Sequence, residues 1–283
     1  APGLGIVLPG GERADVILLA GYDPIEMRQG WRHPFPAGTP VIDIVAEAQT
    51  HGMHGASLLL EGDVPAILDR LSAALPAARR DVWAGGEPAA VRNRFREAFA
   101  GDGGWGPHAV FSILREAAPA ETIATADSGA HRILLSQMWR CDGPRRLLQS
   151  TGFCTMGCAL PLAMGAALGA DRPVLCFVGD AGLEMVLGEL AILRDLGLPV
   201  VVTLLADRSL GLIALKQRQM GLARAGVDFG GTDFAAVAAA MGGHGVLIED
   251  RATLEREAKA AFARQGFTLL ACAIDRSAYD GAF

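Results

Sequence analysis

The sequence predicts an α/β protein whose parallel sheet is covered by helices on both faces. Runs of Val and Leu of strand length alternate with helix-length segments, which is typical of strands buried on both faces. The 36 glycines and the 6% of aromatic residues suit many tight strand-to-helix turns. With 283 residues, of which 51% are hydrophobic and 20% are charged, the chain is long enough for a well-packed core and about two domains.

The first 80 residues predict a small α/β unit. Short apolar segments at 15–20, 39–44 and 56–63 predict strands, and an apolar repeat with helical spacing follows at 64–78. These elements are few for a complete domain of this class.

A polar, glycine-rich segment with one short helix-like stretch covers residues 81–106, and we interpret it as a linker. The stretch GDGGWG at 101–106 is also compatible with a phosphate-binding loop. Because it follows no predicted strand and opens no βα unit, the linker is the better interpretation.

A regular alternation of helices and strands begins at Pro107 and predicts the main domain, residues 107–283. In such a sheet, ligands bind beyond the carboxyl ends of the strands. The pattern predicts helices over 108–119, 160–170, 183–197, 233–242 and 253–265, and strands over 121–127, 173–180, 199–207, 244–250 and 267–275.

Composition and charge argue against several classes of function. The net charge of −6 and the lack of a Lys and Arg cluster argue against a nucleic-acid partner, since the densest basic stretch, 140–146, is short and contains Asp142. No apolar run reaches the length of a membrane span, and the first residues lack a signal-peptide pattern. The five cysteines form no CxxC motif, which argues against a zinc site and favours a reduced, cytoplasmic compartment.

Two acidic residues stand at the ends of consecutive strands of this predicted sheet. Asp180 closes the strand 173–180, and Asp207 closes the strand 199–207. If the strands are adjacent, both carboxylates lie at one sheet edge, where they repel each other unless a proton or a cation lies between them. Such oxygen ligands suit Mg²⁺, which takes one or two carboxylates from a protein and completes its shell with phosphate and water.

Small residues around the first acid favour a phosphate site. Gly179, Ala181 and Gly182 permit a sharp turn into the next helix, whose N-terminal amides attract an anion. The combined pattern predicts a metal-bridged diphosphate at a strand-to-helix turn. In the alternative interpretation, Asp180 is only a helix N-cap and Asp207 is only a turn residue.

The spacing of these acids resembles the fingerprint of thiamine-diphosphate (ThDP) enzymes. Gly179-Asp180-Ala181 is followed, after twenty-four residues, by Ala206-Asp207, although Asn is usual at position 206 in that family. The resemblance implies that the side chains of Asp180 and Asp207 and the backbone carbonyl of Ser209 bind Mg²⁺. It implies a cofactor-binding set that includes Gly179, Asp180, Ala181, Gly182, Asp207, Ser209, Leu210, Gly211 and Leu212.

Two further segments resemble parts of the same family that contact the cofactor. In the segment 151–169, the resemblance implies that Met156 props the cofactor in its bent shape and that the carbonyl of Cys154 accepts a hydrogen bond from the 4′-amino group. The segment DSGAH at 127–131 matches the position of diphosphate contacts, which implies roles for Gly129, Ala130 and His131. His131 is alternatively an ordinary histidine at a helix start.

Within the family, the chain is most similar to acetolactate synthases of the catabolic, FAD-independent branch. GYDPIE at 21–26, VDFG at 227–230 and IDRSAYD at 274–280 carry this likeness. The resemblance implies that residues 1–80 are the second half of a Rossmann-like middle domain and that residues 107–283 are the C-terminal domain that binds the diphosphate and Mg²⁺.

The resemblance also implies what lies outside this sequence. The chain has no initiator Met and is expected to start inside the middle domain. Relatives carry an N-terminal pyrimidine-binding domain whose glutamate protonates the cofactor, and the cofactor lies between subunits. We therefore expect a homodimer or homotetramer in which a second subunit supplies that domain, and we expect this chain alone to be inactive.

The implied reaction is decarboxylation of a 2-oxo acid such as pyruvate and transfer of the hydroxyethyl unit to a second 2-oxo acid, in branched-chain amino acid or acetoin metabolism. Lys216 is either a substrate-facing cation or a solvated surface residue. Alternatives are a simple 2-oxo acid decarboxylase, an oxalyl-CoA-type enzyme, a sulfoacetaldehyde acetyltransferase, or a non-catalytic fragment or scaffold subunit. A nucleotide-binding Rossmann protein is disfavoured because no G-x-G-x-x-G motif follows a strand.

Overall fold

The computed structural model describes residues 14–23, 32–48, 52–75 and 85–281 and divides the chain into two compact units, Ala1–Arg96 and Glu97–Phe283. The division falls inside the predicted linker 81–106, and the helix α2 (Glu87–Ala98) crosses it. The proposed domain boundaries stay a prediction. The parts of the predictions that fall on residues 1–13, 24–26, 76–84 and 282–283 lie outside the described residues.

The first unit holds a three-stranded parallel sheet in the order β1-β2-β3. Its elements are β1 (Ile17–Ala20), β2 (Val41–Val45), β3 (Leu58–Glu61) and α1 (Val64–Ala74). Helix α1 begins after Asp63, whose carboxylate accepts a hydrogen bond from the Ala66 amide at 2.8 Å.

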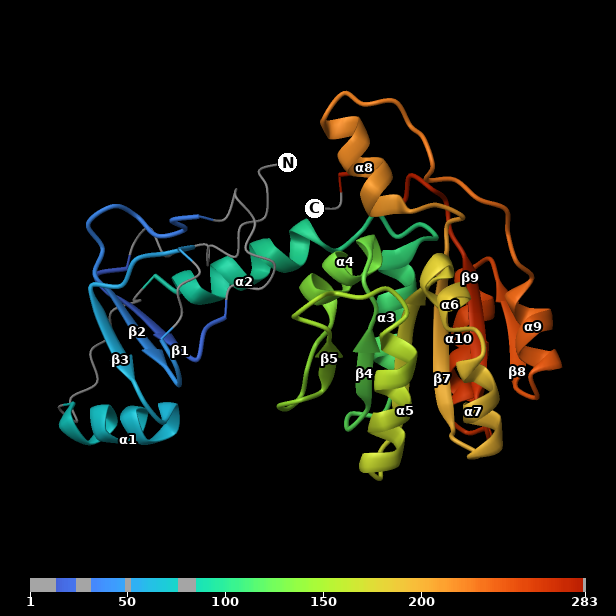
Figure 1. The fold of residues 1–283 in the computed structure, drawn as a ribbon, viewed down its shortest axis with the longest axis horizontal. Helices are drawn as coiled ribbons and strands as arrows, with labels where there is room; N and C mark the ends of the chain where they lie inside the picture. Colours follow the sequence, from blue (N-terminus) through green and yellow to red (C-terminus); the bar gives the residue numbers. More distant parts are fainter. Residues whose placement is uncertain (1–13, 24–31, 49–51, 76–84, 282–283) are drawn as a thin grey trace. The chain divides into compact units, whose positions relative to one another are not determined.

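The second unit is built on a six-stranded, all-parallel sheet in the order β5-β4-β6-β7-β9-β8 (Figure 1). This arrangement confirms the predicted fold class. The elements are α3 (Pro107–Ala117), β4 (Ile123–Ala126), α4 (Ala130–Met138), β5 (Leu147–Gln149), α5 (Ala159–Gly169), β6 (Val174–Gly179), α6 (Asp180–Met185), α7 (Glu189–Asp195), β7 (Val200–Ala206), α8 (Gly211–Gln219), α9 (Phe234–Ala240), β8 (His244–Ile248), α10 (Arg251–Ala261) and β9 (Thr268–Ala273).

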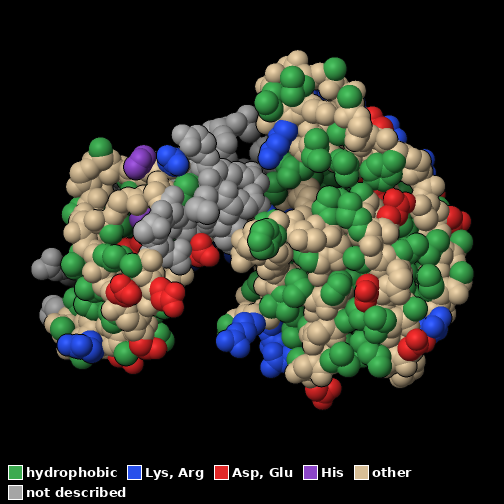
Figure 2. All heavy atoms as spheres, viewed as in Figure 1, with side chains coloured by type: hydrophobic (Ala, Val, Ile, Leu, Met, Phe, Trp, Pro, Cys, Tyr) green, Lys and Arg blue, Asp and Glu red, His purple; other side chains and the backbone are tan. Residues whose placement is uncertain are grey.

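Helices cover both faces of this sheet. Helices α5, α6, α7 and α9 pack on one face, whereas α3, α4 and α10 pack on the other (Figure 1). The outer side of α5, α6 and α7 is largely apolar, with charged side chains scattered over it (Figure 2). Leu168, Met185, Ile192 and Leu196 on and beside these helices are between 39% and 64% exposed. No helix in the described part of the chain is long and apolar enough to cross a membrane.

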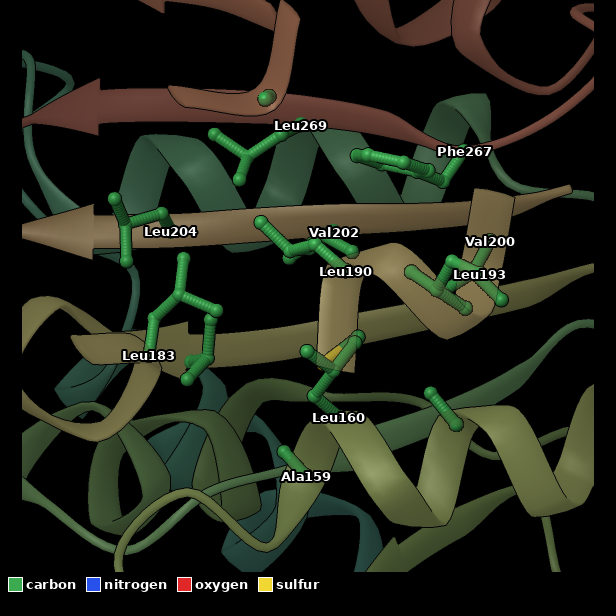
Figure 3. Close-up of a cluster of buried hydrophobic side chains, with 14 of the residues drawn as sticks. Ala159, Leu160, Leu183, Leu190, Leu193, Val200, Val202, Leu204, Phe267 and Leu269 are labelled. Carbon is green, nitrogen blue, oxygen red and sulfur yellow. The ribbon is translucent and has the colours of Figure 1, made fainter. Parts of the chain in front are cut away.

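The core lies between the sheet and these helices. On the α5–α7 side, Leu160, Leu183, Leu190 and Leu193 meet alternate residues of the strands, among them Val202 (Figure 3). The other strand residues point to the opposite face and pack against the second helical layer. The strands are therefore apolar at nearly every position, which explains their continuous apolar sequences.

Aromatic rings fill the opposite side of the sheet. Phe177 in β6 makes edge contacts with Phe111 at 5.4 Å and with Trp139 at 5.2 Å between ring centroids. Such tilted pairs add to the stabilisation from burial. Together the two layers anchor β6, the strand that ends beside Asp180.

The structure corrects one predicted helix. The segment 183–197 was expected to form a single helix, but it forms α6 and α7, with a break at Val186 to Gly188. Helix α6 begins at Asp180, directly after β6, and its last turn is interrupted where Val186 adopts φ −127°. Helices α4 and α8 and the short strand β5 were not predicted. Their segments carry polar residues that interrupt the apolar periodicity.

The start of α10 offers a stability test away from the sheet edge. Asp250 accepts hydrogen bonds from the amide and the hydroxyl of Thr253 at 2.9 and 2.8 Å. We expect Asp250→Ala to lower the free energy of unfolding by about 0.5–2 kcal/mol, because the helix loses its N-cap. Urea denaturation measures this effect. Asp250→Asn keeps a capping oxygen and should lie close to the wild type; equal loss in both variants would contradict the capping role.

Candidate functional site

A pocket of about 160 Å³ opens at the carboxyl ends of β4, β6 and β7. Every predicted cofactor-binding residue except Cys154 lines it. The lining residues are Ser128, Gly129, Ala130, His131, Met156, Gly179, Asp180, Ala181, Gly182, Leu205, Asp207, Ser209, Leu210, Gly211, Leu212, Ile213 and Tyr279.

The two acids lie at the same edge of the sheet because β6 and β7 are adjacent, with Gly179 paired to Leu205. The side chains of Asp180 and Asp207 are 4% and 7% exposed. The sequence predicted that the two carboxylates lie at one sheet edge if their strands are adjacent, and β6 and β7 are adjacent.

Backbone amides fix the orientation of both carboxylates. Asp180 accepts hydrogen bonds from Ala181 N at 2.8 Å and Arg208 N at 2.6 Å, and Asp207 accepts one from Ser209 N at 3.0 Å. Arg208 has φ 55°, a left-handed conformation that turns the chain so that its amide meets Asp180. The loop after β7 is thus shaped around the first acid.

Burial and mutual repulsion suit this pair of acids to binding a cation. Burial, and next the charge of Asp180, raise the pKa of Asp207 to about 7, although the Ser209 amide opposes the shift. Burial also raises the pKa of Asp180. A cation between the carboxylates relieves this strain. Within the described ranges, no group of three or more His, Cys, Asp or Glu side chains is placed to hold a metal, so a cation here takes its other ligands from backbone, water or a bound anion.

The junction between β4 and α4 forms a second wall of the pocket. A Cβ atom at Gly129, which has φ 148°, would lie 2.9 Å from the His131 ring, and one at Gly179 would lie 3.3 Å from it. His131 is 5% exposed, and its Nε2 atom has no hydrogen-bond partner among the described residues. Burial lowers the pKa of His131 to about 4 against the opposing charge of Asp127, so the ring is neutral at pH 7 and can donate one hydrogen bond.

Sequence reasoning missed Asp127, a fully buried acid that joins three segments of the site. Its carboxylate accepts hydrogen bonds from Gly157 N at 2.8 Å and from the Cys158 thiol at 3.5 Å. A Cβ atom at Gly182 would lie only 2.1 Å from the same carboxylate. Asp127 follows a strand, as Asp180 does, and this position was the available signal.

Two predicted residues lie outside the pocket. The carbonyl of Cys154 accepts a hydrogen bond from the Ser128 hydroxyl, and its thiol lies 3.3 Å from Nη1 of Arg132. Lys216 is exposed on α8. The predicted contact of Cys154 with the cofactor and the predicted role of Lys216 toward substrate therefore stay predictions.

A known protein family matches the part of the chain that contributes most of this pocket. The family described as "Thiamine pyrophosphate enzyme, C-terminal TPP binding domain" matches residues 127–272. The chain is 37% identical over 159 residues to the acetolactate synthase large subunit of Parasynechococcus marenigrum, covering 55% of this chain and 25% of that protein.

Two relatives match over a longer stretch. A probable 2-ketoarginine decarboxylase of Pseudomonas aeruginosa is 30% identical over 276 residues, and the catabolic acetolactate synthase of Raoultella terrigena is 25% identical over 270 residues. Each match covers 93% of this chain and 48% of the relative. The chain thus spans about half the length of these relatives, or less.

Proposed function

The chain belongs to the thiamine pyrophosphate enzyme family, and on this basis we propose that its second unit binds ThDP through a Mg²⁺ ion held by Asp180 and Asp207. The observation that carries the proposal is the pair of buried carboxylates at the ends of adjacent strands in one pocket. The donor set fits, because Mg²⁺ accepts two carboxylates and takes its remaining ligands from carbonyl, phosphate and water oxygens.

Each wall of the pocket has a proposed task. The Ser209 carbonyl completes the protein ligands of the cation, while Gly129 and the neutral His131 face the diphosphate. Met156 supports the rings of the cofactor, and Asp127 holds the turn that carries it through Gly157 N. The cofactor, when bound, supplies the electron sink for decarboxylation. The protein orients it and keeps the acids ionised by means of the cation.

We further propose that the complete enzyme acts on 2-oxo acids and resembles acetolactate synthase in joining two of them. The acetolactate synthases among its relatives support this reaction. A simple 2-oxo acid decarboxylase is the second candidate, favoured by the relative named as a probable 2-ketoarginine decarboxylase. Product analysis with pyruvate separates the two, since ligation yields acetolactate and simple decarboxylation yields an aldehyde.

A partner subunit is part of the proposal. The exposed apolar side of α5, α6 and α7 suits a protein interface (Figure 2). We propose a homodimer or homotetramer in which the pyrimidine-binding domain of another subunit covers the pocket. All five cysteines are free thiols, which supports the proposed cytoplasmic location.

Calorimetry with ThDP and Mg²⁺ tests the cofactor assignment. We expect the chain of 283 residues to bind ThDP only when Mg²⁺ is present, and to show no turnover of pyruvate until a pyrimidine-binding domain is supplied. Failure to bind would contradict the cofactor role and favour a scaffold subunit. Acetolactate formed by the isolated chain would contradict the proposed need for a pyrimidine-binding domain.

A further inference from the structure

The segment 275–280, which follows β9, contributes a wall of the pocket that the proposed function does not use. Tyr279 lines the pocket and is 5% exposed. Its Cδ2 atom lies 3.8 Å from the point where a Cβ of Gly211 would stand, and the same point lies 2.9 Å from Oδ2 of Asp207. The phenol ring therefore lies near the second acid and the start of α8.

The Tyr279 hydroxyl is a hydrogen-bond donor in the wall of the pocket. Tyr279 is more than nine-tenths buried, and no hydrogen bond joins its hydroxyl to another described residue. A phenol ordinarily titrates at about pH 10, so the hydroxyl is protonated at neutral pH and can donate a hydrogen bond. The side chain lines the pocket, so an oxygen atom of a bound ligand is an acceptor that its position offers.

Two ion pairs hold this segment in place. Arg218 of α8 forms a bidentate pair with Asp280, at 2.5 and 2.7 Å. Arg276 lies 3.7 Å from Asp228, which also pairs with Arg224. The guanidinium of Arg224 in turn donates to the Ser209 hydroxyl at 2.9 Å. The segment is thereby tied both to α8 and to the loop that carries the second acid.

We propose that Tyr279 is a binding residue of this pocket, whose hydroxyl donates a hydrogen bond to a diphosphate oxygen, and that the pair Arg218–Asp280 holds it in position. The inference deepens the proposed function and rests on it. It assigns the segment 275–280 to recognition of the anion rather than to the chemistry on the substrate.

Pyrophosphate is the probe, because it carries the diphosphate without rings that absorb in the ultraviolet. With saturating Mg²⁺, we expect Tyr279→Phe to weaken pyrophosphate and ThDP binding by about tenfold each, the usual size for a hydrogen bond to a charged group. The chain has two tyrosines, so Tyr22→Phe in the first unit is the matched control and should bind as the wild type does. Unchanged affinity in Tyr279→Phe, or weaker binding of ThDP alone, would overturn the proposal.

A spectroscopic readout separates contact from a structural effect. Adding Mg²⁺ and pyrophosphate should give a tyrosine difference spectrum in the wild type and in Tyr22→Phe, and none in Tyr279→Phe. A spectrum that survives in Tyr279→Phe contradicts the contact. If the wild type binds neither pyrophosphate nor ThDP, the proposed cofactor binding is wrong. If the wild type binds both and Tyr279→Phe binds equally well, only the role of Tyr279 is wrong.

The ion pair provides an independent variant set. Arg218→Glu and Asp280→Arg should each weaken pyrophosphate binding several-fold, and the double variant should restore it, because the reversed charges pair again. Single variants that bind like the wild type would show that the pair does not position Tyr279.

Discussion

Asp207→Asn is expected to lower the affinity for ThDP and Mg²⁺ by about 100-fold or more, while the empty protein becomes more stable. On the proposed assignment, the substitution removes one of the two charges that hold the cation, and loss of one partner of a buried ionic pair is costly. It also removes a carboxylate that is buried beside another acid and whose raised pKa is only partly offset by the charge of Arg276. Calorimetry and urea denaturation, each in the presence and absence of EDTA, measure the two effects.

The stability effect has a defined pH dependence. The pKa of Asp207 is raised from 3.8 to about 7 in the folded chain, so between these values the folded state binds more protons than the unfolded state. The free energy of unfolding of the metal-free wild type therefore falls as pH rises from about 4 to about 7. Asn does not titrate, so the advantage of Asp207→Asn should grow over that range.

Asp195→Asn is the control for charge alone, because Asp195 is an exposed acid on α7 away from the pocket. It should change neither the affinity nor the pH profile. Wild-type affinity in Asp207→Asn would contradict the metal site, and a pH-independent stability difference would contradict the raised pKa.

Gly182→Ala is expected to lower the free energy of unfolding by about 1–3 kcal/mol and to weaken cofactor binding. The new methyl group would lie 2.1 Å from the Asp127 carboxylate and 3.4 Å from Gly157 N. The methyl group fits only if the carboxylate moves away from the Gly157 amide, from which it accepts a hydrogen bond at 2.8 Å. The turn that carries Met156 then loses its support. Thermal denaturation and ThDP titration record the two losses.

Gly188→Ala is the matched control in the same stretch of chain. Gly188 has φ −61°, and a Cβ atom there meets no atom within 4 Å. Alanine should therefore leave stability unchanged or raise it by up to about 1 kcal/mol, because it restricts the unfolded chain. Equal destabilisation in both variants would show that the contact with Asp127 is not responsible.

The parts of the site that local sequence patterns determine were predictable. Asp180 and Asp207 stand directly after apolar runs, and parallel strands bring such positions to one edge. The glycines around Asp180 follow from the turn between β6 and α6. The family model and the relatives confirm the resemblance on which the cofactor was named.

The rest depends on contacts between distant residues. The role of Asp127 is visible only when Gly157 and Gly182 are placed around it. Tyr279 lines the pocket from a segment that is distant in sequence, next to the ion pair of Asp280 with Arg218 of α8. The break between α6 and α7 likewise leaves the apolar periodicity intact, so the pattern predicted one helix over 183–197.

The residues that line the pocket extend along the sequence from the end of β4 to the segment after β9. Any occupant therefore links the beginning and the end of the second unit, and ligand that binds only the folded state raises the free energy of unfolding by RT ln(1 + [L]/Kd). On the proposed assignment, the lifetime of the protein against proteolysis follows the vitamin B1 supply of the cell that makes it. Starvation for the vitamin would lower the amount of enzyme as well as its activity.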